Sequence, residues 1–211
     1  MKHTCFIDTS SYVHLSKDDC YVNGKTLLSL FGKEVNLKFS NEVNHEISRH
    51  YTNLMPTSHE RSSKVYKLKN RKIKTYKEYE NRLFDGFSVA GDRNRGEKFN
   101  LAASLDCYLY KKTVGLIYLT DDKNAINSIL KEPISCFPVL HIWNSFDVIL
   151  FLLLRNKYFG IEFAETAIRN LNAELAKNHS PQTSPEKTQE RINIWKTYVS
   201  RANRVQKLLN E

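Results

Sequence analysis

The sequence predicts an α/β fold, a three-layer sandwich in which helices cover both faces of a mostly parallel sheet of about four to five strands. Short apolar segments typical of buried strands alternate along the chain with segments of helical periodicity, and this alternation favours βαβ units. The composition, 41% hydrophobic and 26% charged, is typical of a globular protein. A length of 211 residues suits one domain with a sizeable core and an appendage.

The first part of the chain alternates strands and helices. Residues 5–7 are an apolar run that ends at Asp8, as expected of a buried strand that leads into a turn. Residues 35–39 alternate apolar and polar side chains like a half-exposed strand, and Ser40 then offers a hydroxyl that caps a helix. We therefore expect strands over residues 5–7 and 35–39 and helices over residues 25–33 and 41–51.

Residues 60–84 have the pattern of one long helix or two, because an apolar stripe and a basic stripe both recur at helical spacing. The apolar stripe consists of Val65, Leu68, Tyr76, Tyr79 and Leu83. The basic stripe consists of Lys64, Lys67, Arg71 and Lys74. Residues 85–96 contain three glycines and predict a loop.

The rest of the chain continues the alternation and then becomes helical. Ser145 is the expected cap of a buried helix, and residues 179–185 form a Ser/Pro/Thr linker. The expected helices lie over residues 97–111, 125–130, 146–154 and 161–177, and the expected strands over residues 114–119 and 136–143. A final helix begins at Ser184-Pro185, where a capping hydroxyl precedes a proline in the first helical position.

These elements divide the chain into two parts. Residues 1–155 form the α/β domain, with a Lys-rich helical insertion at about 55–95, and residues 156–211 form a helical extension. The last helix carries apolar side chains at coiled-coil-like spacing, which are Ile192, Trp195, Val199, Ala202, Val205 and Leu209. We expect this helix to pack on the core of its own chain, and a homodimer or another protein interface is the alternative.

The chain is strongly basic. Its 32 Lys and Arg outnumber its 23 Asp and Glu, and the net charge of +9 favours an anionic partner such as nucleic acid or a membrane surface. The longest apolar run, over residues 148–154, is far shorter than the ~20 residues that span a bilayer. Met1 leads directly into the first strand, and the four cysteines are scattered without metal-type spacing. These features predict a cytoplasmic protein without a membrane segment.

Most of the excess charge lies between residues 59 and 82, where nine Lys and Arg against three Glu give a charge of +6. Contacts of such residues to phosphates dominate nucleic-acid affinity, and Tyr66, Tyr76 and Tyr79 are candidates for stacking on bases. The alternative is a solvated helix face with tyrosines in the core. The predicted nucleic-acid contacts are Lys64, Lys67, Arg71 and Lys74.

Acidic residues lie where strands end and helices begin. Asp8 follows the first strand, and Glu97 opens a helix after the glycine loop. Asp121 and Asp122 follow the third strand. In a doubly wound sheet, ligands bind at the carboxyl ends of the strands. Glu46, in the middle of its helix, projects toward the same edge if that helix packs beside it. The alternative for each single acid is a helix cap or a turn residue.

Several carboxylates at one edge would repel one another unless cations neutralised them. Oxygen ligands select Mg²⁺ or Mn²⁺ rather than zinc. Two such ions ~4 Å apart activate a water molecule and stabilise the leaving oxygen of an in-line displacement at phosphorus. The pattern therefore indicates metal-dependent hydrolysis of phosphodiester bonds, and this chemistry needs no catalytic histidine.

The order of these acids resembles that of PIN domains, the metal-dependent nucleases of many toxin–antitoxin ribonucleases and RNA-processing factors. Their first acid ends the first strand, as in FIDTS at residues 6–10, and their second lies in a V-x-x-E-[I/L] helix, as in VNHEI at 43–47. Their third often comes from a Gly-Glu pair, as at 96–97, and their fourth from a T-x-D pattern, as in TDD at 120–122. The resemblance covers residues 1–155.

The resemblance implies a set of metal-binding catalytic acids, consisting of Asp8, Glu46, Glu97, Asp122 and, as an assisting neighbour, Asp121. It also implies hydroxyls that orient the ligands or the scissile phosphate, which are Thr9, Ser10 and Thr120. Because the third acid of many relatives is an Asp, Asp92 and Asp106 are alternatives to Glu97. Glu42 lies one helical turn before Glu46 and competes with it for the second position.

The resemblance further implies a Mg²⁺- or Mn²⁺-dependent endoribonuclease that acts on RNA in the cytoplasm. A toxin of a toxin–antitoxin or defence system, controlled by an antitoxin or another protein partner, is one form of this expectation. Two alternatives stay open. PIN-like domains with incomplete acid sets act as RNA-binding modules or scaffolds without catalysis. The other alternative is a metal-dependent nuclease directed at DNA, or another phosphoesterase on a related sheet.

Overall fold

The computed structural model has an α/β fold built on a four-stranded parallel sheet, in which the strands lie in the order β2-β1-β3-β4. It describes residues 2–17, 24–51, 64–68, 95–111, 115–122, 140–156, 159–179, 189–190, 192–197 and 199–200. The strands are β1 (Thr4–Ile7), β2 (Asn36–Lys38), β3 (Leu116–Leu119) and β4 (Leu140–Trp143). β1 and β3 are buried throughout, as expected of central strands with helices on both faces.

The order of the strands reverses between β1 and β3. From β1 the chain crosses to β2 on one side, and it later returns to the other side of β1 to form β3 and then β4. Thr4 accordingly pairs with Asn36 of β2 and with Leu116 of β3. Such a topological switch point opens a crevice at the carboxyl ends of the strands. Asp8 follows β1 and Thr120 follows β3, so these two residues flank the switch point.

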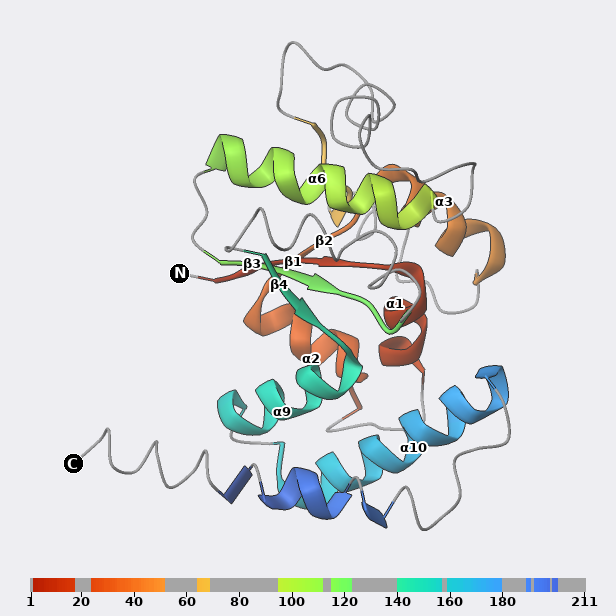
Figure 1. Cartoon of the computed structure of the whole chain (residues 1–211), viewed down its shortest axis with the longest axis vertical. Helices are drawn as coiled ribbons and strands as arrows, with labels where there is room; N and C mark the ends of the chain where they lie inside the picture. The colour runs from red at the N-terminus through yellow and green to blue at the C-terminus, as the bar shows by residue number, and fades with distance from the viewer. Residues whose placement is uncertain are drawn as a thin grey trace, which may run out of the picture.

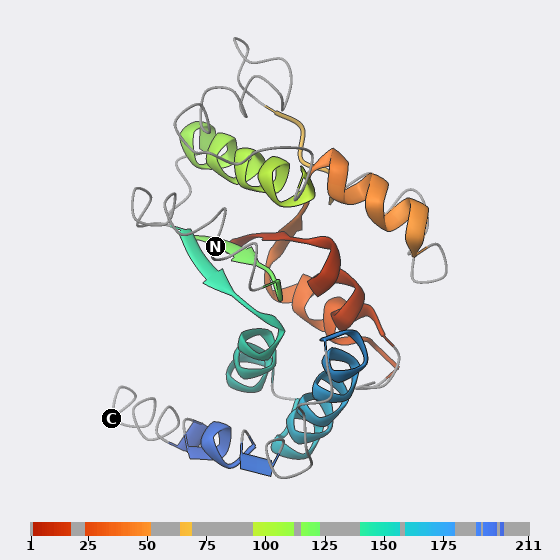
Figure 2. The ribbon, with the colours of Figure 1, turned by 45° about the vertical axis from the view of Figure 1, so that its right-hand side comes forward.

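Helices cover both faces of the sheet (Figure 1). They are α1 (Thr9–Ser16), α2 (Leu27–Glu34), α3 (Asn41–His50), α6 (Arg95–Lys111), α9 (Ser145–Arg155) and α10 (Ile161–His179). Helix α6 lies over one face with α3 beside it, whereas α1, α2 and α9 lie on the other side and α10 packs against α9 (Figures 1 and 2). The predicted α/β class, with helix layers around a parallel sheet, is confirmed.

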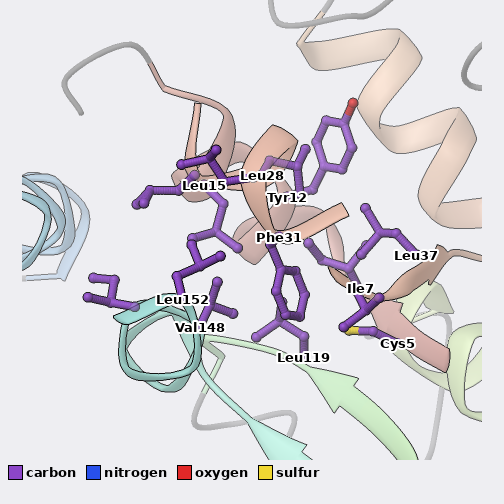
Figure 3. Close-up of a cluster of buried hydrophobic side chains, with 14 of the residues drawn as sticks. Cys5, Ile7, Tyr12, Leu15, Leu28, Phe31, Leu37, Leu119, Val148 and Leu152 are labelled. Carbon is purple, nitrogen blue, oxygen red and sulfur yellow. The ribbon is translucent and has the colours of Figure 1, made fainter. Parts of the chain in front are cut away.

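The larger hydrophobic core lies between the sheet and the α1, α2 and α9 layer (Figure 3). Because side chains alternate along a strand, Cys5 and Ile7 of β1 belong to this core, whereas Phe6 points to the opposite face. Phe31 of α2 is fully buried in it, with its ring 5.8 Å from that of Phe151. The extension contributes buried residues to the same core, which are Phe159, Ala164, Ala167, Ile168, Leu171 and Ile192.

The second core lies between the sheet and α6. Phe6 of β1 and Tyr118 of β3 are fully buried here, and Leu101 and Ala103 of α6 pack onto them. The ring of Tyr66 meets that of Phe6 edge-on at 5.5 Å. Phe6 and Tyr118 come from the central strands β1 and β3, so this core holds α6 over the switch point.

The long helix predicted over residues 60–84 is wrong at residues 65–68. Val65 forms a parallel bridge with Phe39, and the N–H of Tyr66 donates to the carbonyl of Phe39 at 2.9 Å. Phe39 follows the edge strand β2 and offers backbone groups that need partners, and β-branched and aromatic residues suit an extended segment beside it. This tertiary pairing overrides the helical periodicity.

Tyr66 is buried in the second core, and this corrects the prediction that it stacks on bases. Its side chain is 4% exposed and its hydroxyl donates to Asp106 at 2.9 Å. Burial, followed by this bond, raises the pKa of Tyr66 above its ordinary value, so the phenol stays protonated. Tyr76 and Tyr79 lie outside the described residues.

One helix was not predicted, and the start of another differs from the sequence prediction. Only a turn was expected after Asp8, whereas helix α1 (Thr9–Ser16) begins there and is capped by Asp8 itself. Ser145 is the first residue of α9 rather than its cap, because Asn144 accepts the N–H groups of Phe146 and Asp147. The carboxylate of Asp147 in turn accepts the N–H of Asn144 at 2.8 Å, which completes a capping box. The hydroxyl of Ser145 is thereby left for another partner.

The remaining elements agree with the sequence to within a few residues where they are described. β3 begins at Leu116, after Gly115 with a φ of +81°, and β4 is described from Leu140 onward. Most of the predicted glycine loop, the predicted helix over residues 125–130 and most of the predicted linker lie outside the described residues. In the part of the chain that is described, none of the helices combines the length and the apolar character needed to span a bilayer.

Candidate active site

Asp8 stands at the carboxyl end of β1, where the chain turns into α1. Its backbone N–H donates to the carbonyl of Leu119 at 3.0 Å, so the pairing of β1 with β3 continues through this residue. Its Oδ1 accepts the N–H of Ser11 at 2.8 Å and caps α1. Its Oδ2 accepts the hydroxyl of Ser10 at 3.0 Å and the hydroxyl of Thr120. The first turn of α1 and the end of β3 therefore hold this carboxyl, which is 2% exposed.

Burial raises the pKa of Asp8 to about 7. The hydrogen bonds from Thr120, Ser11 and Ser10 lower this pKa, and the negative charge of Asp121 raises it, but the loss of hydration is the largest effect. Near neutral pH the carboxyl therefore exists in both its protonated and its ionised form. A cation beside it would favour the ionised form.

Glu46 reaches the site from the middle of α3. Val43 and Ile47 of the same helix are buried, and Glu46 lies at the border of this buried face. The hydroxyl of Thr9, the residue after Asp8, donates to Oε2 of Glu46. This bond ties α3 to the beginning of α1 and brings Glu46 to the end of β1.

Gly96, in the first turn of α6, makes room for the Glu46 carboxylate. A Cβ atom at position 96 would lie 2.7 Å from Oε1 and 2.9 Å from Oε2 of Glu46, closer than real Cβ atoms approach an oxygen. The carboxylate therefore lies against the N-terminal turn of α6, where the helix dipole favours a negative charge. In the Gly96-Glu97 pair, the glycine leaves space for the carboxylate of Glu46, and the next residue contributes its own carboxylate.

Glu97 is half-buried at the start of α6. Burial raises its pKa, and the negative charges of Glu46 and Asp122 raise it further, so both of these carboxylates are close enough to repel that of Glu97. The hydroxyl of Tyr118 donates to the backbone carbonyl of Glu97 at 3.0 Å and holds the start of α6 on the sheet. Burial, followed by the charge of Asp8, raises the pKa of Tyr118 well above its ordinary value.

Thr120 connects Asp122 to Asp8. Its hydroxyl donates to the Asp8 carboxyl and accepts the backbone N–H of Asp122 at 3.1 Å. Its own N–H donates to the carbonyl of Trp143 at 2.9 Å, which keeps the end of β3 against the end of β4. Thr120 is fully buried and Asp122 is half-buried. The half-buried Asp122 thus follows a residue, Thr120, that is bonded both to Asp8 after β1 and to Trp143 of β4.

Asp121, which was predicted to assist as a metal ligand, is bonded to α1 and α9. Its Oδ2 lies 2.8 Å from Nδ1 of His14 and accepts the hydroxyl of Ser145 at 2.6 Å, and its Oδ1 accepts the N–H of Ser145 at 2.8 Å. Burial raises the pKa of Asp121, but the bonds from His14 and Ser145 outweigh this effect and the pKa is lowered. Asp121 therefore connects α1 and α9 to the end of β3. The carboxylate oxygens that would bind a metal ion accept these hydrogen bonds instead.

The structure brings four of the predicted acids together from four separate elements. These are Asp8, Glu46, Glu97 and Asp122. The end of β1, the first turn of α6 and helix α3 lie at the same end of the molecule (Figure 1). Residues far apart along the chain thus form one acidic cluster at the topological switch point.

The donor atoms of this cluster are carboxylate and hydroxyl oxygens, which are the ligands that Mg²⁺ and Mn²⁺ prefer. Among the residues that the structure describes, no group of three or more His, Cys, Asp and Glu side chains is arranged so that it could hold a metal ion as it stands. Thr120 and Thr9 bond carboxylate oxygens of Asp8 and Glu46 instead. The side chains of the cluster are of the types that bind such an ion, but hydroxyl groups already donate hydrogen bonds to some of the carboxylate oxygens.

The predicted alternatives to these acids lie elsewhere. Glu42 forms an ion pair with Arg95, 3.3 Å apart, on the surface beside the site. Asp106 is buried against Tyr66, nine residues after Glu97 on α6, which places it about 13 Å further along the helix axis. Asp92 lies outside the described residues.

Only two of the four predicted nucleic-acid contacts are described. Lys64 is half-buried and helical, whereas Lys67 is exposed and lies outside a helix, so the two do not share the helix face that was predicted for them. Because Val65 between them pairs with Phe39, which follows β2, this segment lies at the same carboxyl edge as the acids. Arg71 and Lys74 lie outside the described residues.

Several residues that hold the site were not predicted from the sequence. Tyr118, His14 and Asn100 are the main ones, and Asn100 donates to the carbonyl of Ile7 at 2.8 Å. The alternation along β3 could have indicated that Tyr118 faces α6. His14 and Asn100 have no local signal, because their partners lie far away in the sequence.

Comparisons with known proteins give no match: no family model matches the chain, and neither the curated proteins nor the solved structures searched contain a significant match. The fold and the site therefore define the chain only as an α/β protein with a parallel sheet and an acidic cluster at its switch point.

Replacing Asp8 by Asn is expected to remove a pH dependence of stability. The folded pKa of about 7 exceeds the ordinary value of 3.8, so the folded state binds more protons than the unfolded chain between these pH values. The free energy of unfolding therefore falls as the pH rises from about 4 to about 7. Asp8→Asn still caps α1 but cannot ionise, and it should exceed the wild type by on the order of 2–4 kcal/mol at pH 8.

Urea denaturation of both proteins between pH 4 and pH 8.5, in the presence of a chelator, measures this difference. The two stabilities should converge near pH 4, where the carboxyl is protonated in both states. Parallel pH profiles for the two proteins would contradict the assignment of the raised pKa to Asp8.

Proposed function

We propose that this protein is a metal-dependent nuclease that hydrolyses phosphodiester bonds in RNA, with Mg²⁺ or Mn²⁺ held by Asp8, Glu46, Glu97 and Asp122. The observation that carries the proposal is the gathering of these four carboxylates from four elements, at an edge where burial, and then the charges of Glu46 and Asp122, raise the pKa of Glu97. The repulsion among these carboxylates disfavours their ionised forms, and divalent cations bound to their oxygens would offset this repulsion.

The chemistry follows from the oxygen ligands. Divalent ions bound at such carboxylates lower the pKa of a water molecule and stabilise the leaving oxygen at phosphorus. The chain's own residues keep the carboxylates in place. Thr120 and Ser10 hold Asp8, and Thr9 holds Glu46, so that the acids are oriented before a substrate arrives. The net charge of +9 favours a polyanionic substrate.

The choice of RNA rests on the resemblance of the four acid-bearing motifs to those of PIN domains. The residues matched by those motifs are the same four that lie together at the switch point. The resemblance also supports a cytoplasmic toxin, restrained by an antitoxin or another protein partner, as the biological form of the activity. A homodimer through the last helix is the further partner that the sequence suggests.

A non-catalytic RNA-binding module is the second candidate, and the environment of Asp8 favours it. Both oxygens of this carboxyl already accept hydrogen bonds, and burial holds its pKa near neutrality. A carboxyl that stays protonated does not bind a divalent cation. In this case the basic chain would hold RNA without cutting it.

The wild-type protein is expected to cleave total RNA when Mn²⁺ or Mg²⁺ is present and to lose this activity when a chelator is added. Asp8→Asn preserves the size and the cap of α1 but removes an ionisable ligand, so cleavage should fall by about 100-fold or more. Glu165→Gln is the matched control, because Glu165 lies on α10, where it pairs with Lys196 at 2.7 Å.

Initial rates on a labelled RNA and on a DNA of the same sequence, together with RNA binding in chelator, separate the candidates. Cleavage of DNA in preference to RNA would support the DNA-directed alternative. Tight RNA binding by a wild-type protein that never cleaves would support the binding module. Full activity of Asp8→Asn would refute the proposed role of the cluster.

Gly96→Ala is expected to separate activity from stability. The new methyl group displaces the end of the flexible Glu46 side chain, which costs little stability, but it moves a carboxylate away from the site. Activity should therefore fall by about tenfold or more, on the scale of other changes that misplace a metal ligand. Gly32→Ala, on α2, meets no atom within 4 Å and serves as control. Cleavage rates and melting temperatures of both variants test this, and an active Gly96→Ala would contradict it.

Asp121 and its neighbour Asp122 are expected to respond in opposite ways. Asp121→Asn weakens the bonds to His14 and Ser145 and should lower the free energy of unfolding by about 1–3 kcal/mol, while metal-dependent cleavage remains. Asp122→Asn removes the charge of a proposed metal ligand and should abolish cleavage. Chemical denaturation and cleavage rates of the two variants distinguish these roles, and a reversed pattern would assign the ligand to Asp121.

A further inference from the structure

Asn100 is a fully buried residue of α6 that uses both ends of its side-chain amide. Its Nδ2 donates to the backbone carbonyl of Ile7 at 2.8 Å. Its Oδ1 accepts the backbone N–H of Ser40, also at 2.8 Å. Its side chain therefore bonds to the last residue of β1 and to the residue that caps α3.

The amide of Asn100 lies where the pairing between β1 and β2 ends. The last paired residues of the two strands are Phe6 and Lys38. Beyond them Phe39 directs its N–H and carbonyl outward to residues 64–66, so Ser40 faces the β1 side. The side-chain amide, with one donor and one acceptor, takes the place of a peptide group between the diverging strands. It gives both of these buried backbone groups a hydrogen-bond partner.

Each of the three elements that meet at Asn100 carries one acid of the cluster. Ile7 directly precedes Asp8. Ser40 caps α3, whose middle residue Glu46 reaches the site. Asn100 itself follows Glu97 by three residues, which is nearly one turn of α6. A shift at Asn100 would therefore change the separation of all three carboxylates.

We infer that Asn100 is a positioning residue that sets the distances among Asp8, Glu46 and Glu97 for a shared divalent cation. The inference rests on the proposed function for the identity of the cation. Only an amide fulfils this role at its size. Aspartate has no N–H for the carbonyl of Ile7, and leucine offers neither group. Asn100 acts through the backbone of its neighbours and not by contact with a substrate.

The test is calorimetric titration of Mn²⁺ into the wild-type protein, Asn100→Leu and Asn100→Asp. Both variants are expected to bind Mn²⁺ at least about tenfold more weakly, as found when residues that orient metal ligands are removed. Asn100→Asp keeps the acceptor for Ser40 and is the variant to use if Asn100→Leu does not fold. Asn172→Leu is the matched control, because Asn172 is also buried but belongs to α10, which carries none of the acids.

A melting curve accompanies each titration, so that a loss of affinity is compared between variants of similar stability. If Asn100→Leu or Asn100→Asp folds and binds Mn²⁺ as tightly as Asn172→Leu, the inference is overturned. A wild-type protein that binds no Mn²⁺ would overturn it as well. Cleavage of RNA is measured separately on the same samples. Wild-type binding that depends on Asn100, without any cleavage, would refute the proposed nuclease and leave the positioning role intact.

Discussion

A buried carboxyl at the end of the central strand is the constraint on which this molecule depends. Asp8 cannot be hydrated at 2% exposure, so its oxygens need partners from the protein. Ser11 and Ser10 of α1 supply two of them, and Thr120 at the end of β3 supplies another. The same bonds begin a helix and join the ends of the two strands at the switch point. One side chain therefore caps α1, joins the ends of β1 and β3, and supplies a carboxylate to the site.

The elements around Asp8 bring further carboxylates to the site. Glu46 arrives on α3 and lies against Gly96, and Glu97 follows on α6, so burial and mutual repulsion act together on the site. A fold that needed only stability would place a cation or apolar groups here. The neighbouring acid Asp121 shows the contrast, since His14 and Ser145 satisfy it and lower its pKa. Two adjacent aspartates thus have different environments, because Asp121 is bonded to His14 and Ser145, whereas Asp122 lies beside Glu97 in the cluster.

The sequence predicts the strands and most helices because their periodicity is local, and the same reasoning places Asp8, Glu97 and Asp122 at the ends of elements. It fails where distant contacts decide. Val65 pairs with Phe39 in spite of a helical pattern. Asp121 was predicted to assist as a metal ligand, because its bonds to His14 and Ser145 join residues far apart in the sequence. Asn100 could not have been found, since its two partners lie 60 and 93 residues away. Fold class follows from local patterns, whereas the support of the site follows from tertiary pairing.

The bridge between Phe39 and Val65 also affects how copies of this chain meet. A free sheet edge is a template for strands of other molecules, and proteins protect such edges with short or covered strands. Here β2 has only three residues, and the backbone groups of Phe39 just beyond it are already bonded to residues 64–66. A foreign strand finds little to pair with on that side. The outer side of β2 is thereby protected from intermolecular sheet growth, and aggregation through this strand is disfavoured.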